Sequence, residues 1–155
     1  MKTWLLLAGA VLPLAAAGAM PGVDDAQRAQ RNWMMQCQGC HGAAAAGNAS
    51  GVPGIAGAVA RFLGVEGGRE YLIRVPGVAN AALSDERLAE LLNWTLQRFD
   101  GAHVPAHFVP FTADEIAALR QRPYASEAFA VRAALLAALA DKTGTPGGAE
   151  VDQAP

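Results

Sequence analysis

Apolar residues in the middle of the chain recur at the spacing of one helix face. Four leucines stand at positions i, i+3, i+4 and i+8 of one segment, a period that predicts an amphipathic α-helix; they are Leu88, Leu91, Leu92 and Leu96. Ser84 is a favourable N-cap residue for this helix, and the pair Asp100-Gly101 ends it. We therefore expect one long core helix over residues 85–100.

Capping residues and helix breakers mark further helices on both sides of this one. A first helix runs from about Asp24 into a cysteine pair at 37–40, with acidic residues at its positive end. A short helix follows Gly67-Gly68 and must stop before Pro76, and Thr112 opens a capping box. A glycine-rich loop covers 42–57. The fold class is expected to be all-α, with the remaining helices over about 24–37, 68–74, 113–122 and 126–142.

The start of the chain has the pattern of an export signal. Lys2 supplies a positive charge, residues 4–17 are mostly apolar, and Ala17-Gly18-Ala19 fits the cleavage rule of signal peptides. The alternative is a retained membrane anchor, which the short apolar stretch and its small-residue end disfavour. We expect a signal peptide at 1–19, one domain at 20–143 (core 24–99, helical extension 100–143) and a disordered tail at 144–155.

Composition narrows the possible functions. The chain has 155 residues and a formal net charge of −2, without a basic run, so no nucleic-acid partner is expected. No segment after the export signal is long and apolar enough to span a bilayer. The sequence shows no catalytic carboxylate pair, no nucleophile with its base and no phosphate loop, and we do not expect an enzyme.

The segment Cys37-Gln38-Gly39-Cys40-His41 carries the most specific chemistry. C-x-x-C-H is the attachment signature of a c-type haem, because two thiols one helical turn apart can both reach the vinyl groups of one porphyrin edge. The histidine that follows is then placed to bind the iron. A thioredoxin-like redox pair would follow a strand, and a zinc site would need the distant His103 and His107. We therefore predict one covalent haem c on Cys37 and Cys40, with His41 as the proximal iron ligand.

Several weaker signals surround this segment. Ala29 and Trp33 lie eight and four positions before Cys37, Trp94 lies on the leucine-patterned helix, and a glycine-rich loop with Pro53 follows the box. With these residues, 24–99 resembles the class I c-type cytochromes. The resemblance implies a small cytochrome c-like helical fold around one haem, here with extra C-terminal helices. It also implies that Trp33 and Trp94 pack together, and that the Pro53 carbonyl accepts a hydrogen bond from His41 Nδ1.

The chain departs from that family at the sixth iron ligand. Class I cytochromes usually provide a methionine from the loop before the last core helix, but here that loop, 75–83, has none, and no methionine follows the box. Three alternatives stay open. His103 or His107 ligates the iron, with His103 slightly favoured; or both are solvated loop residues; or the distal position is empty or holds water.

These features predict a periplasmic electron-transfer protein. It would shuttle electrons from a periplasmic dehydrogenase toward a terminal oxidase or another cytochrome of the respiratory chain. A narrower similarity is to the small cytochromes that serve periplasmic alcohol or amine dehydrogenases. The alternative function is that of a small haem enzyme or ligand-binding sensor with an open distal site.

Overall fold

The computed structural model describes residues 19–144, and this part of the chain is helical, without a strand. The all-α prediction is confirmed. The predicted export signal, apart from Ala19, and the predicted tail after Gly144 lie outside the described residues. The elements are α1 (Ala26–Gln36), α2 (Gln38–His41), η1 (Val59–Gly64, a 3₁₀ helix), α3 (Gly68–Arg74), α4 (Pro76–Ala79), α5 (Asp85–Asp100), η2 (Gly101–His103, 3₁₀), α6 (Ala113–Arg120) and α7 (Ala128–Thr143).

Side-chain capping bonds begin three of these helices, and two of the caps, Ser84 and Thr112, are those that the sequence predicts. Asp25 accepts a hydrogen bond from the Arg28 N–H at 2.9 Å, Ser84 accepts one from Arg87 N–H, and Thr112 accepts one from Glu115 N–H. These bonds satisfy backbone donors that the first turn of a helix leaves free. α7 begins two residues after Ser126 and has no side-chain cap.

The loop expected over 75–83 is partly helical. Pro76 ends α3 as predicted, but it also stands at the first turn of the short helix α4. Proline favours this position because its fixed φ suits a helix and its missing N–H has no partner there. The sequence does not indicate the helices η1, η2 and α4, since none of them has a clear apolar period.

The centre of the molecule is formed where α1 lies against α5. Trp33 of α1 and Trp94 of α5 are only 3% and 5% exposed, and their ring centroids are 6.4 Å apart. Phe99 packs on both, 4.6 Å from the Trp33 ring and 5.6 Å from the Trp94 ring. The prediction that the two indoles are buried together is confirmed, and ring pairs at such distances add to the energy of burial.

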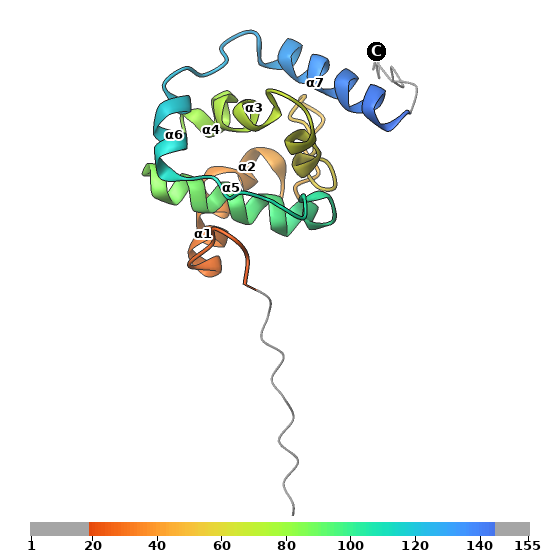
Figure 1. Cartoon of the computed structure of the whole chain (residues 1–155). Helices are drawn as coiled ribbons and strands as arrows, with labels where there is room; N and C mark the ends of the chain where they lie inside the picture. The colour runs from red at the N-terminus through yellow and green to blue at the C-terminus, as the bar shows by residue number, and fades with distance from the viewer. Residues whose placement is uncertain (1–18, 145–155) are drawn as a thin grey trace, which may run out of the picture.

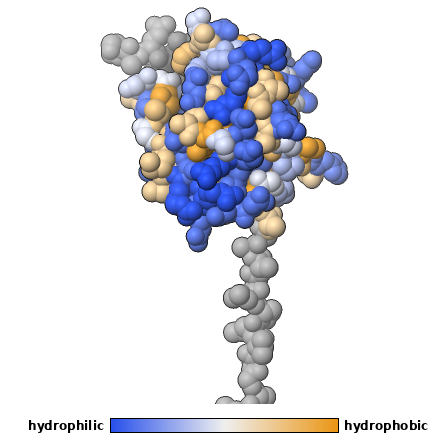
Figure 2. All heavy atoms as spheres, turned by 90° about the vertical axis from the view of Figure 1, so that its left-hand side faces the viewer, coloured by the Kyte–Doolittle hydropathy of each residue, from blue (hydrophilic) through white to orange (hydrophobic). Residues whose placement is uncertain are grey.

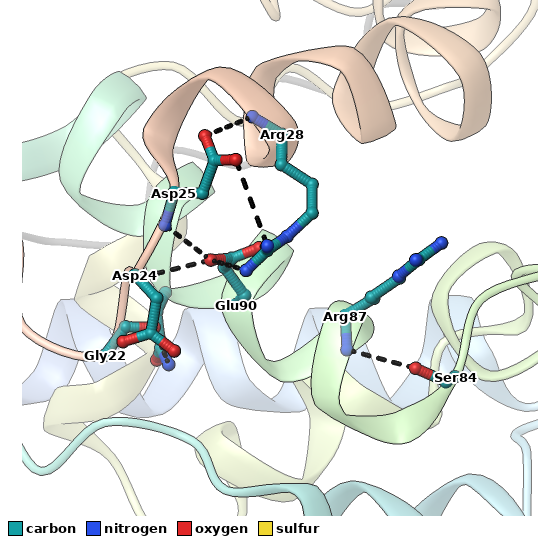
Figure 3. A network of polar contacts seen from close by, with 8 residues as sticks. Gly22, Asp24, Asp25, Arg28, Ser84, Arg87 and Glu90 are labelled. Carbon is teal, nitrogen blue, oxygen red and sulfur yellow. Dashed lines mark hydrogen bonds and ion pairs between the residues drawn. The ribbon is translucent and has the colours of Figure 1, made fainter.

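A buried carboxylate ties the start of α1 to α5 (Figure 3). Glu90 accepts hydrogen bonds from the backbone N–H of Asp24 and Asp25 and a two-pronged pair from Arg28, at 2.7 to 3.1 Å. Burial acts to raise the pKa of Glu90, but the bonds from Arg28 and Asp25 oppose it, and the pKa lies below the ordinary value of 4.5. The carboxylate is therefore charged near neutral pH and fixes the angle at which α1 enters the core.

The C-terminal helices pack on the segment that resembles cytochromes. α6 contacts α5 and α3, and α7 contacts η1 and α3, so that in Figure 1 α7 lies on the far side of α3 from α5. Asn93 of α5 fastens the extension, because its side chain exchanges hydrogen bonds with the backbone of Phe111 and donates to the Gly22 carbonyl. Ile116 of α6 is fully buried, whereas α7 buries Leu135 alone.

The surface shows no extended apolar face on the side that Figure 2 presents. That side carries α4, α6 and the beginning of α5, and it is mostly hydrophilic with small, separate apolar patches, as is usual for protein surfaces. Within residues 19–144, no helix is long and apolar enough to cross a membrane.

Candidate haem-binding site

The cysteine box stands at the junction of α1 and α2. The N–H of Cys37 donates to the Trp33 carbonyl and so closes α1, while the Cys37 carbonyl accepts from the N–H of His41 in the next turn. This one-turn helix places both thiols and the imidazole beside one cavity, which all three side chains line. The residues that the sequence predicts for haem attachment are thus brought together.

The glycine-rich loop folds back onto the box. Asn48 donates from its side chain to the Cys40 carbonyl at 2.9 Å, and the N–H of Gly47 donates to the His41 carbonyl at 3.0 Å. Gly47 has a φ of +80°, and a Cβ there would collide with the backbone of Val52 and Gly54. Only glycine therefore permits this close return of the chain.

The return of the loop sets the environment of the predicted iron ligand. The Pro53 carbonyl oxygen lies 3.1 Å from His41 Nδ1, so Nδ1 carries the proton in this arrangement and Nε2 is left free for a metal. The indole of Trp33 stands on another side of the imidazole, with ring centroids 6.1 Å apart. The ring of His41 is thereby oriented before any metal binds.

The cavity beside the box suits a flat apolar group. Its volume of about 450 Å³ is in the range of pockets that hold small molecules and cofactors. The wall is mostly apolar and draws on six helices besides the box, with Trp33 from α1, Val59 and Phe62 from η1, Leu72 from α3, Val78 from α4, Leu88 and Leu91 from α5, and Phe129 from α7. The porphyrin of a haem has a matching apolar character.

One buried donor in this wall has no partner in the protein. Trp33 lines the cavity, and its indole Nε1 is buried without a hydrogen bond to any described residue. An unpaired buried donor is costly, and a group bound in the cavity could provide its acceptor. The residues present therefore fit the group that the box implies.

The two thiols differ in their surroundings. Cys37 is half-buried and Cys40 is exposed. Burial, together with the nearby Cys40, raises the pKa of the Cys37 thiol to about 11. In the folded chain without haem this thiol is therefore protonated at neutral pH and is a weak nucleophile.

The structure places neither His103 nor His107 in the wall of the cavity. His103 Nδ1 lies 2.5 Å from the carboxylate of Asp100, which is buried and also accepts from the Ala60 N–H. His107 is exposed. Met34 and Met35 are exposed on α1 and lie outside the wall as well. The assignment of His103 or His107 as sixth ligand stays a prediction, without the geometric support that His41 has.

Arg61, Arg69 and Arg74 each bind another group of the protein. Arg69 binds Glu115, Arg74 binds the Arg122 carbonyl and the Tyr124 hydroxyl, and Arg61 binds the Gly57 carbonyl. None of these three arginines lines the cavity, whereas Arg132 of α7 does. Sequence reasoning missed Arg132 because nothing in an Ala-Leu-rich segment shows which face it turns toward a box about 90 residues earlier in the chain.

Comparison with known proteins is consistent with this site. No protein-family model matches the chain. Two proteins named cytochrome c-552, both from Thermus thermophilus, are each 37% identical to the chain over 105 residues. The matches cover 56% of this chain and 80% and 71% of the two relatives. The chain therefore belongs to the class I c-type cytochromes, a family of haem c electron-transfer proteins.

Proposed function

We propose that this protein is a periplasmic electron carrier with one haem c, bound through thioether bonds to Cys37 and Cys40 and ligated by His41. The observation that carries the proposal is the placement of both thiols and an oriented imidazole in the wall of one apolar cavity. Haem c, when bound, supplies reversible one-electron exchange between ferric and ferrous iron.

The protein's own residues would position this group and set its properties. Pro53 accepts from His41 Nδ1, which fixes the tautomer and makes Nε2 a stronger donor to a metal. The apolar wall excludes water and lowers the local dielectric, which disfavours a charged iron centre and so tunes the potential. The indole N–H of Trp33, which lines the cavity, would be a hydrogen-bond donor available to the bound group. Each of these effects acts through a residue that lines the cavity or contacts one that does.

The partners follow from this role. A carrier of single electrons needs a donor and an acceptor, and we propose a periplasmic dehydrogenase, of the alcohol or amine type, and a terminal oxidase or another cytochrome. Export through a signal peptide at residues 1–19 would deliver the chain to the compartment where bacterial haem c is attached. The division into a core at 24–99 and a helical extension at 100–143 is proposed on the same resemblance.

Optical redox titration tests the proposal on the full chain, produced in a bacterium that attaches haem c. The expected result is one haem per chain and a single wave with the slope of a one-electron process. His41→Ala should abolish the native spectrum, while His107→Ala, an exposed histidine outside the cavity wall, serves as the matched control. Haem content below one per two chains, or a titration that needs two waves, would contradict a single-haem carrier.

A further inference from the structure

Two polar side chains in the cavity wall have no hydrogen-bond partner in the described chain. Tyr71 of α3 and Arg132 of α7 both line the cavity. Within residues 19–144, neither the Tyr71 hydroxyl nor the Arg132 guanidinium makes a hydrogen bond or an ion pair, although the guanidinium lies over the Phe62 ring. In a wall that is otherwise mostly apolar, the hydrogen-bond donors of these two groups are therefore available to a polar ligand.

The two side chains form one cluster around Phe62. The Tyr71 and Phe62 ring centroids are 5.2 Å apart, and the Arg132 guanidinium carbon is 6.0 Å from the Phe62 ring centroid. Tyr71 is only 7% exposed. Burial raises the pKa of Tyr71 despite the opposing charge of Arg132, so the phenol keeps its proton near neutral pH and acts as a donor rather than as a phenolate ligand.

This cluster belongs to a different part of the wall from the box. α2, which carries His41, packs on α1, whereas α7 packs on η1 and α3, and in Figure 1 α3 and α7 lie on the same side of α2. We call Phe62, Tyr71 and Arg132 the far wall. Among residues 19–144, apart from the box itself, the side chains that line the cavity include no methionine, histidine, lysine or cysteine. The wall therefore offers no side chain of the kinds that usually fill the sixth position of a haem iron.

We propose that the far wall makes this cavity a binding site for a small iron-binding anion, with the Tyr71 hydroxyl and the Arg132 guanidinium as its hydrogen-bond donors. This inference rests on the proposed haem attachment and adds a ligand site to the electron carrier. The positive charge of Arg132 selects anions, and Tyr71 adds a donor whose position is fixed by burial. Azide is a suitable probe for the ferric protein, and carbon monoxide is a neutral probe for the ferrous protein.

The experiment uses the full chain with haem attached, after one haem per chain has been verified by the pyridine haemochrome spectrum. A haem content below one per chain would count against the proposed function, and not against the anion site proposed at the far wall. Azide affinity and the electron paramagnetic resonance spectrum are then measured for the wild type, Tyr71→Phe and Arg132→Gln. The matched controls are Tyr124→Phe, whose hydroxyl binds Arg74, and Arg61→Gln, which binds the Gly57 carbonyl; neither control residue lines the cavity.

The proposal expects a high-spin ferric signal without added ligand, ready binding of carbon monoxide to the ferrous protein, and azide binding. Tyr71→Phe and Arg132→Gln should each weaken azide affinity at least tenfold, since each removes a hydrogen bond to a charged group. Carbon monoxide affinity should change less than azide affinity in Arg132→Gln, because the neutral ligand does not sense the charge. Both controls should stay within about twofold of the wild type.

Three results would overturn the proposal. One is a low-spin six-coordinate ferric signal that is lost in His103→Ala or His107→Ala, because it would show that a histidine fills the position. Another is unchanged azide affinity in Tyr71→Phe and Arg132→Gln. The third is an effect in only one of the two variants, which would refute a site built from both donors.

Discussion

The two parts of the cavity wall are held in very different ways. The box and its loop are fixed by short polar contacts and by ring contacts, and His41 meets both the Pro53 carbonyl and the Trp33 indole. In the far wall, Phe62 and Tyr71 are buried, but Arg132 lies on α7, which buries only Leu135 and has no side-chain cap. The rigidly held box suits a group that is bound permanently and must be oriented. The less firmly held α7 suits a ligand that binds reversibly.

The largest expected effect concerns the packing behind the box. Trp94→Ala should lower the free energy of unfolding by about 3–5 kcal/mol, as large-to-small changes of buried aromatic residues do, because Trp94 is only 5% exposed and supports both Trp33 and Phe99. Chemical denaturation measures this loss. A cost below about 1 kcal/mol would contradict the view that α1 is fixed by the aromatic cluster.

Substitutions at two glycines test whether the glycine-rich loop positions the Pro53 carbonyl. Gly47→Ala should cost about 2 kcal/mol, because the new Cβ adds a collision with the Val52–Gly54 backbone to the strain of a positive φ. Gly51→Ala is the matched control, since Gly51 has a φ of +90° but a Cβ at this position would meet no atom within 4 Å. Only Gly47→Ala should also raise the reduction potential, because displacing the Pro53 carbonyl makes the imidazole a weaker donor. Equal effects of the two substitutions would contradict this.

The ion pair between Glu90 and Arg28 at the start of α1 makes the stability of the folded chain depend on pH. The pKa of Glu90 is lower in the folded chain than its ordinary value of 4.5, so its contribution to stability is complete above that value and is lost as the pH falls through the folded-state pKa. Glu90→Gln should cost about 2 kcal/mol at neutral pH, since it weakens hydrogen bonds to a charged group. It should also flatten the fall in stability between neutral pH and pH 3.

Thermal unfolding at several pH values checks this prediction. Asp24→Asn is the control, because the Asp24 side chain takes no part in the Glu90 bonds, which use only its backbone N–H. If Glu90→Gln and the wild type lose stability in parallel as the pH falls, the carboxylate does not have the role assigned to it.

The smallest effect on global stability is expected from a change in α7, the helix that carries Arg132 of the far wall. Leu135→Ala removes the buried contact of α7, so it should speed amide hydrogen exchange throughout α7 while changing the global free energy of unfolding by about 1 kcal/mol or less. Exchange measured by mass spectrometry on peptides from α1 should stay unchanged. If Leu135→Ala lowered the global free energy of unfolding as much as Trp94→Ala, α7 would be held as firmly as the box, which would contradict the comparison.

The sequence predicted the parts of this molecule that depend on local chemistry. The leucine period of α5, the caps at Ser84 and Thr112 and the C-x-x-C-H box each lie within a few residues of the feature that they specify. The Pro53 carbonyl was placed by resemblance to a family rather than by local pattern, and the 3.1 Å distance to His41 Nδ1 agrees with that placement.

Features that depend on distant packing could not be predicted in this way. Arg132 reaches the cavity only because α7 lies across η1 and α3, and the rotation of an Ala-Leu-rich helix about its axis leaves no periodic signal. The position of His103 was also not predicted, although its hydrogen bond to Asp100 spans only three residues, because the short helix η2 that carries His103 has no clear apolar period. The Arg132 contact, in contrast, arises from tertiary structure, which overrides local preference.

The mass of the mature protein after denaturation tests the central claim most directly. The account predicts that the chain purified from a haem-attaching bacterium is heavier than its polypeptide by one haem, that the added mass lies on the peptide with Cys37 and Cys40, and that acid acetone does not remove it. The double variant Cys37→Ala, Cys40→Ala should lack the added mass. A wild-type polypeptide of unmodified mass, or a haem that acid acetone extracts, would contradict the account.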